Sequence, residues 1–131
     1  SNSIMANNLY ILGIIFDNAE YKEMAETMLS SLIRLTLSDP AYTYNWAKLY
    51  GFMAGNTAEI AIVGEEYNQM RAKFASTYLP NKVLMGTTKQ SQLPLLDQKS
   101  KLRDKTTVYV CYNKTCKLPV NDFEAALKQI K

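Results

Sequence analysis

Residues 3–16 constrain the fold more than any other segment, because they combine helical periodicity with apolar side chains on more than one face. One apolar stripe recurs at spacings of four, three and four residues and consists of Met5, Leu9, Leu12 and Phe16. A second stripe consists of Ile4, Ile11 and Ile15. A helix that is apolar on most sides must be buried on most sides. We therefore expect this helix to need more helical partners, or a partner chain.

Two further helices are expected before residue 55. Asp17 and Glu20 have capping-box spacing, which predicts the start of the second helix. Its predicted core-facing stripe consists of Tyr21, Met24, Met28, Leu32 and Leu35. The short link between the first two helices predicts an antiparallel hairpin. Asp39-Pro40 predicts the start of a third helix, and Gly55 predicts its end.

The pattern changes after Gly55. Apolar runs predict strands over 58–63, 83–85 and 106–112, and an amphipathic helix over 65–78 separates the first two strands. A strand-helix-strand unit implies a parallel pair. Asn121 and Glu124 predict a capping box before a last helix at 122–130. The expected fold class is α/β, with N-terminal helices in residues 1–54 and a small three-stranded, mainly parallel sheet with flanking helices in residues 55–131.

The composition excludes several classes of function. The chain has 131 residues and no histidine, so it cannot hold a Ser-His-Asp or Cys-His catalytic pair or a histidine-ligated metal. We expect no cofactor and no metal. Acid–base catalysis without histidine would need a pair of carboxylates, and no pair stands out. Three acids lie on a polar helix face, namely Glu20, Glu23 and Glu26, and the acids next to apolar segments are Glu59 and Asp97.

Charge and hydropathy bear on the partners. The net charge of +3 comes from scattered basic residues, so we expect no nucleic-acid partner. No apolar run approaches the roughly 20 residues of a membrane span, so we expect no membrane partner. No signal peptide is visible, which favours a cytoplasmic protein. The chain begins with Ser1 rather than methionine, so its natural N-terminus is expected to lie further upstream.

Aromatic residues are concentrated in the predicted third helix. Tyr42, Trp46 and Tyr50 recur every four residues, which predicts that they share one helical face. That face is either core or, if the helix lines a cavity, a wall on which a ligand such as a sugar ring stacks.

The two cysteines form the most distinctive local motif. Cys111 and Cys116 are separated by four residues, and Asn113 suits a tight turn between them. Such a turn would bring the two residues within disulfide reach. The spacing differs from the two intervening residues of thioredoxin-type redox motifs. The pair is therefore a structural pair, a redox-active pair, or part of a metal site that takes ligands from outside this chain.

This motif also carries a family resemblance. The run Val108-Tyr109-Val110-Cys111-Tyr112-Asn113-Lys114-Thr115-Cys116, followed by Pro119-Val120, resembles the tail of a family of large thioredoxin-domain-containing proteins. These are the bacterial relatives of the spermatogenesis-associated thioredoxin-like protein. Residues 2–9, 62–64 and 79–81 resemble further segments of that family.

The resemblance implies a three-part protein. A thioredoxin-like domain would be followed by an (α/α)6 toroid similar to six-hairpin glycosidases and sugar epimerases, and then by this tail. Residues 1–54 would be the last toroid helices, and residues 55–131 a small C-terminal α/β subdomain. No catalytic residue of the family can be placed on this chain.

The resemblance favours one function over three alternatives. The favoured hypothesis is a C-terminal fragment that is not catalytic alone, with the missing N-terminal parts of the same polypeptide, or a second copy, as its partner. The alternatives are a carbohydrate-active or carbohydrate-binding protein that uses Tyr42, Trp46 and Tyr50, a thiol redox function of Cys111 and Cys116, and a free-standing interaction module.

Overall fold

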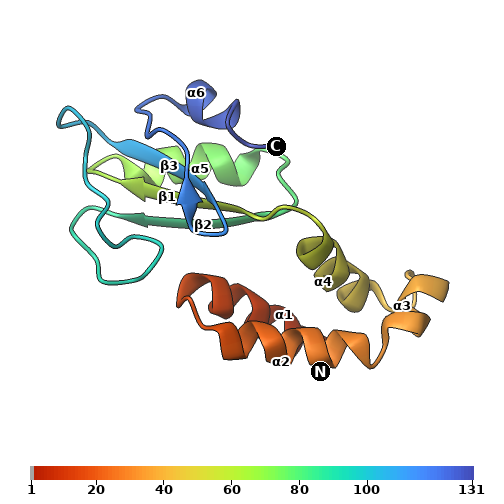
Figure 1. Cartoon of the computed structure of the whole chain (residues 1–131). Helices are drawn as coiled ribbons and strands as arrows, with labels where there is room; N and C mark the ends of the chain where they lie inside the picture. The colour runs from red at the N-terminus through yellow and green to blue at the C-terminus, as the bar shows by residue number, and fades with distance from the viewer. Residues whose placement is uncertain (1) are drawn as a thin grey trace. The chain divides into compact units, whose positions relative to one another are not determined.

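The computed structural model describes residues 2–131, which divide into two compact units that meet between Gly55 and Asn56. The first unit consists of four helices (Figure 1). They are α1 (Asn2–Ile15), α2 (Ala19–Ser30), α3 (Ile33–Ser38) and α4 (Tyr44–Ala54). The core of this unit is small and is built on Ala6, Leu29 and Leu49.

α1 and α2 form the expected hairpin, and they pack through small residues. The buried positions of α1 are Ser3, Ala6 and Gly13. A Cβ atom added to Gly13 would lie 2.6 Å from Cγ of Lys22 on α2, so glycine is what allows the helices to approach so closely there.

The prediction that the apolar stripes of α1 are buried is wrong for this unit. Ile4, Met5, Leu12 and Phe16 are 53%, 56%, 37% and 49% exposed. The helix turns its small residues inward, because they permit close backbone packing. These four large apolar side chains are consequently exposed, whereas Leu9, Ile11 and Ile15 are half-buried.

The details of the next helices also differ from the prediction. The N-cap of α2 is Asn18, whose Oδ1 accepts a hydrogen bond from Tyr21 N at 3.1 Å, and not Asp17. The fully buried residues of α2 are Ala25 and Leu29, and Met28 is the residue of the predicted stripe that packs, partly buried, against this core.

The predicted second helix, whose stripe extends to Leu35, is two helices in the structure, because α2 ends at Ser30 and α3 begins at Ile33. The predicted start of the third helix at Asp39-Pro40 is wrong, because α4 begins at Tyr44. α3 and α4 are separated by a turn that contains Asp39 and Pro40, and Oδ1 of Asp39 accepts from Tyr42 N at 3.2 Å. The predicted end at Gly55 is confirmed, because Gly55 is the C-cap of α4.

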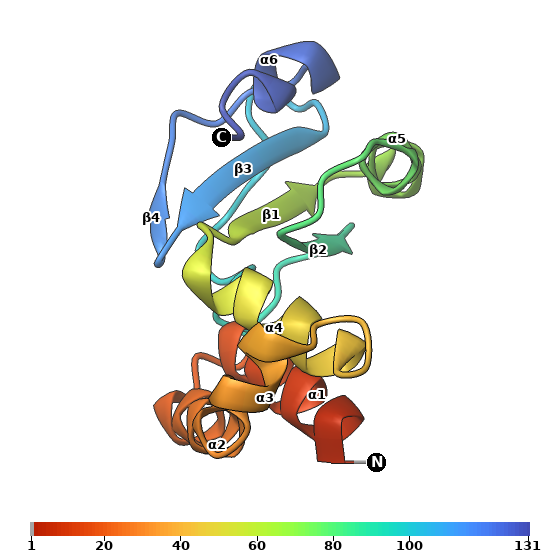
Figure 2. The same cartoon turned by 90° about the vertical axis from the view of Figure 1, so that its right-hand side faces the viewer.

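The second unit is a sheet with helices on one face. Its elements are β1 (Ala58–Val63), α5 (Tyr67–Ser76), β2 (Lys82–Thr87), β3 (Thr107–Tyr112), β4 (Thr115–Cys116) and α6 (Phe123–Leu127). The strand order is β2-β1-β3-β4 (Figure 2). β1 and β2 are parallel and are connected through α5, which confirms the predicted strand-helix-strand unit.

The expected fold class is nevertheless wrong. β3 pairs with β1 in antiparallel orientation, and β4 pairs antiparallel to β3. The sheet is therefore four-stranded and mixed, with one parallel pair, and the chain is a small α/β protein rather than a toroid end followed by a three-stranded parallel sheet. The physical reason lies in the β2–β3 connection, which carries no helix that could return the chain for another parallel strand.

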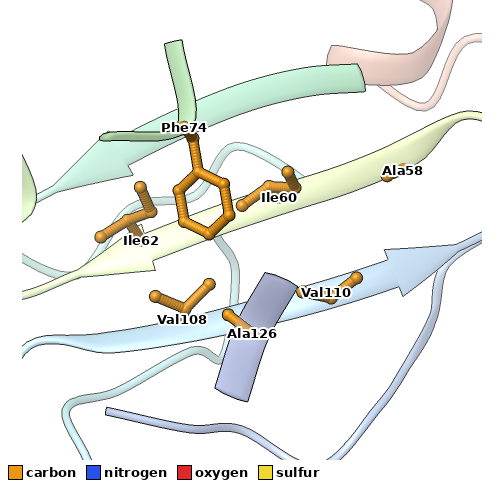
Figure 3. Close-up of a cluster of buried hydrophobic side chains, with 7 residues drawn as sticks. All are labelled: Ala58, Ile60, Ile62, Phe74, Val108, Val110 and Ala126. Atoms are coloured by element: carbon orange, nitrogen blue, oxygen red, sulfur yellow. The ribbon is translucent and has the colours of Figure 1, made fainter. Parts of the chain in front are cut away.

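The core of this unit lies between the sheet and its two helices. Phe74 of α5 and Ala126 of α6 are fully buried against alternate residues of the two central strands (Figure 3). Those strand residues are Ile60, Ile62, Val108 and Val110. The rings of Phe74 and Phe123 meet edge to face, with centroids 4.8 Å apart. All six residues of β1 are buried, which explains why apolar residues occupy every position of the strand except Glu59.

Asn121 ties the last helix to the sheet. The N-cap of α6 is Asp122, whose Oδ2 accepts from Ala125 N at 2.9 Å, so the predicted capping box at Asn121 is wrong. Asn121 Nδ2 instead donates to Thr106 O and to Thr107 Oγ1, each at 3.0 Å. The side chain therefore holds the start of β3 beside the segment that leads into α6. Within residues 2–131, no helix is both long and apolar enough to span a membrane.

Candidate functional site

The Cys111–Cys116 hairpin is the most defined candidate site. Asn113 and Lys114 form the two-residue turn between β3 and β4, with φ of 47° and 67°. Positive φ at both positions is typical of a type I′ turn, whose twist matches that of the flanking strands. Asparagine tolerates this conformation better than most residues.

The turn sets the two cysteines directly opposite each other. Cys111 pairs with Cys116, and Tyr112 pairs with Thr115. Lys117 N donates to Val110 O at 2.8 Å, so the cysteines occupy the intervening non-hydrogen-bonded position, where opposing side chains lie closest. Their Cα atoms are 3.8 Å apart, and the two sulfur atoms form a disulfide.

The two halves of this disulfide differ in exposure. Cys111 is 1% exposed, whereas Cys116 belongs to β4, both of whose residues are exposed. A reagent in solvent is therefore expected to meet Cys116 before Cys111.

A buried carboxylate lies next to the buried cysteine. Glu59 on β1 is the register partner of Cys111, and side chains that are directly opposite in a sheet lie on the same face. Glu59 is 8% exposed and is the one charged residue among residues 2–131 that is buried. Its Oε2 accepts a hydrogen bond from Lys114 N at 3.4 Å, so it also contacts the hairpin turn.

Lys99 interacts electrostatically with this carboxylate and packs beside Tyr109. The Lys99 ammonium lies 5.8 Å from the centroid of the Tyr109 ring, and the Tyr109 hydroxyl donates to Ser100 O at 2.8 Å. Burial lowers the pKa of Lys99, while the negative charges of Glu59 and Asp97 oppose that shift. The disulfide therefore adjoins a partly buried group of opposite charges, an environment that is found more often at functional sites than elsewhere.

The disulfide adds only modest stability by restricting the unfolded chain. The cysteines are five residues apart, and closing so short a loop in the unfolded chain stabilises a fold by about 2 kcal/mol. Neither cysteine belongs to the core cluster between the sheet and its helices.

The predicted aromatic face is not assembled as expected. Tyr42 precedes α4, which begins at Tyr44, so Tyr42 does not share a helical face with Trp46 and Tyr50. Tyr42 and Trp46 line one hollow of about 460 Å³ together with Ser3. Tyr50 lines a different hollow of about 330 Å³, beside Leu29 and Met53. The structure thus brings two of the three predicted residues together.

Sequence reasoning missed the neighbours of the cysteines. It noted Glu59 as an acid beside an apolar segment, but the contact with Cys111 depends on the antiparallel pairing of β1 with β3. A single acid inside a buried strand was the available signal. No group of three or more potential metal ligands occurs among residues 2–131.

The comparisons with known proteins connect the chain to one mammalian protein. Over 132 aligned residues it is 24% identical to human spermatogenesis-associated protein 20. The identity to the rat protein of the same name is 23% over the same length. Both alignments cover 93% of this chain. No family model and no solved structure matches the chain.

The extent of the similarity is informative. The chain spans 17% of the length of these two relatives. The distant similarity therefore relates this chain to a fragment of a much larger protein.

Proposed function

We propose that the chain is a non-catalytic segment of a longer protein, in which the N-terminal helical unit packs its exposed apolar face against other residues of the same polypeptide. The observation that carries this proposal is the outward face of α1. Met5 and Leu12 of α1 and Phe16, which directly follows the helix, recur at spacings of seven and four residues, so they lie on one face, and all three are exposed.

The other helices of the unit add to this apolar surface. Met24 on α2 and Leu35 and Leu37 on α3 are 47%, 44% and 61% exposed. Scattered apolar residues are normal on a protein surface, but large groups of them usually mark an interface. The helical unit therefore has the surface composition of a part that is covered in the complete protein.

The lengths of the relatives favour the same polypeptide as the occupant. The similarity extends over nearly the whole chain but only 17% of either relative, so most of each relative lies outside the aligned region. Further helical hairpins of one longer polypeptide would supply an intramolecular partner at high effective concentration. A more specific version of this proposal is that the longer polypeptide also contains a thioredoxin-like domain that precedes this chain.

Dye binding and sedimentation of the chain test the proposal. We expect the chain to bind a fluorescent apolar probe or to self-associate. We expect a variant with Met5→Gln, Leu12→Gln and Phe16→Gln to lose most of that behaviour. The matched control replaces three exposed apolar residues of the second unit, Tyr78, Leu102 and Leu118, by glutamine, and should retain it.

Three results would count against the proposal. A monomeric chain that does not bind the probe would favour a free-standing interaction module. An equal loss of probe binding or self-association in the control variant would mean that the α1 face is not the surface responsible. If a longer polypeptide that includes the preceding residues still binds the probe through α1, the occupant is not the same chain.

A further inference from the structure

We propose that the Cys111–Cys116 hairpin is a reversible thiol-exchange site, at which Cys116 forms a mixed disulfide with a low-molecular-weight thiol and Cys111 is the resolving thiol. This inference does not depend on the proposed function, because it concerns only the second unit. It rests on the unequal exposure of the two cysteine residues, on the position of the bond outside the core cluster between the sheet and its helices, and on the charged groups beside Cys111.

The exposure of the cysteines fixes the direction of attack. Thiol–disulfide exchange requires the attacking thiolate to reach one sulfur atom of the disulfide. Cys116 lies on the exposed strand β4, whereas Cys111 is buried on β3 between β1 and β4. The entering thiolate therefore reaches the sulfur of Cys116.

The chemistry of the step is balanced. The thiolate of the small molecule forms a bond to Cys116 Sγ, the Cys111–Cys116 bond breaks, and its electron pair leaves on Cys111 Sγ, which then takes a proton from solvent. In the reverse step the Cys111 thiolate attacks Cys116 Sγ and expels the small thiolate. The entering thiol is the only co-reactant, and its release in the reverse step restores the starting disulfide.

The fold suits a bond that opens and closes. The type I′ turn and the Lys117 N to Val110 O hydrogen bond hold the two cysteines opposite each other by backbone contacts alone. The buried cluster of Ile60, Phe74 and Val108 lies on the helix-covered face of the sheet and includes neither cysteine. Opening the disulfide therefore leaves this helix-covered cluster and the backbone hydrogen bonds of the hairpin in place, so the released thiol stays beside its partner.

Glu59 is a positioning residue for this site. Its carboxylate contacts the turn through Lys114 N and lies beside Cys111 in the sheet. A negative charge there disfavours the thiolate of Cys111, which makes Cys111 a poorer leaving group and a more basic nucleophile once it is released. The positive charge of Lys99, which interacts electrostatically with Glu59, partly offsets this effect.

Peptide mapping after exposure to reduced glutathione tests the assignment. The folded chain is incubated with glutathione, acid-quenched, denatured and alkylated, and then digested with trypsin. Cleavage after Lys114 places Cys111 in residues 106–114 and Cys116 in residues 115–117. We expect the glutathione adduct on Cys116 in at least about tenfold excess over Cys111, because a buried sulfur reacts only after local opening.

Two variants provide a matched comparison, since each lacks the same disulfide. With oxidised glutathione, Cys111→Ser should form an adduct on Cys116 at least about ten times faster than Cys116→Ser forms one on Cys111. The Cys111→Ser adduct should persist after glutathione is removed, whereas the wild-type adduct should resolve.

Three results would overturn the proposal. An adduct that is mainly on Cys111, or equal on both cysteines, would show that exposure does not select the site. Equal rates in the two variants would also show that exposure does not select the site. The same conclusion holds if loss of the disulfide unfolds the sheet and both cysteines become equally reactive. The bond is purely structural if glutathione does not open the disulfide of the folded chain under conditions in which it opens the disulfide of the unfolded chain.

Discussion

Reduction of the Cys111–Cys116 disulfide should lower the free energy of unfolding only slightly. A disulfide stabilises mainly by restricting the unfolded chain, and the restriction grows with the length of the closed loop. Here the cysteines are five residues apart, which corresponds to about 2 kcal/mol at 25 °C. A two-residue turn that favours the hairpin already restricts the unfolded segment, so this value is an upper estimate.

Urea unfolding with and without a phosphine reductant measures this quantity. We expect the midpoint to fall while the denaturant slope changes little, because the surface exposed on unfolding is nearly the same. Cys116→Ser should reproduce the shift without reductant. The reference variant is Phe74→Ala, which removes a fully buried ring from the core and should cost about 3–5 kcal/mol.

The reasoning is refuted if reduction costs as much as Phe74→Ala. A loss of about 4 kcal/mol or more would mean that the bond holds the sheet together. Disappearance of the near-ultraviolet circular dichroism of the reduced chain, in the absence of denaturant, would lead to the same conclusion.

Three further predictions follow from single contacts in the second unit. Gly64→Ala should destabilise by about 1–3 kcal/mol in chemical denaturation, because Gly64 has φ of 142° and an added Cβ would lie 2.6 Å from Thr106 Cα; an unchanged midpoint would contradict this. Asn121→Ala should cost about 1–3 kcal/mol by the same measurement, because buried Thr107 and the Thr106 carbonyl lose a donor; a cost below that of a surface alanine substitution would refute it. Glu59→Gln keeps an acceptor for Lys114 N but removes the charge beside Cys111, so glutathione should open the disulfide about threefold to tenfold faster by alkylation kinetics, and an equal or slower rate would remove Glu59 from the account.

The strands of the second unit could be predicted because their signals are local. The run from Ala58 to Val63 is apolar except for Glu59 and is followed by Gly64, and the structure buries all six residues. The helix that follows carries Phe74 toward the sheet, as its periodicity indicated. Such patterns identify an element whatever it pairs with.

The direction of β3 could not be predicted in the same way. A strand has the same alternating pattern whether it runs parallel or antiparallel to its neighbour, and the connection before it has no helix to decide the matter. The contact between Glu59 and Cys111 depends on that direction. The cysteine pair was therefore visible in the sequence, whereas its buried acidic neighbour was not.

The helices of the first unit show a different limit. Counting apolar residues on α1 predicted that its large side chains face inward, but Ala6 and Gly13 form the contact and Met5 and Phe16 remain exposed. Small residues give weak hydrophobic signals although they permit the closest helix packing. At the next helix, Asp17 takes a left-handed backbone with φ of 52°, which moves the N-cap by one residue to Asn18.

The central claim, that this chain is a segment of a longer protein, is tested most directly by reading the gene upstream of the codon for Ser1. We predict that the open reading frame continues upstream for several times the length of this chain and encodes apolar helical hairpins that can cover α1. An in-frame stop codon shortly before the segment, with translation beginning at Met5, would contradict the claim. The exposed face of α1 would then require a separate partner.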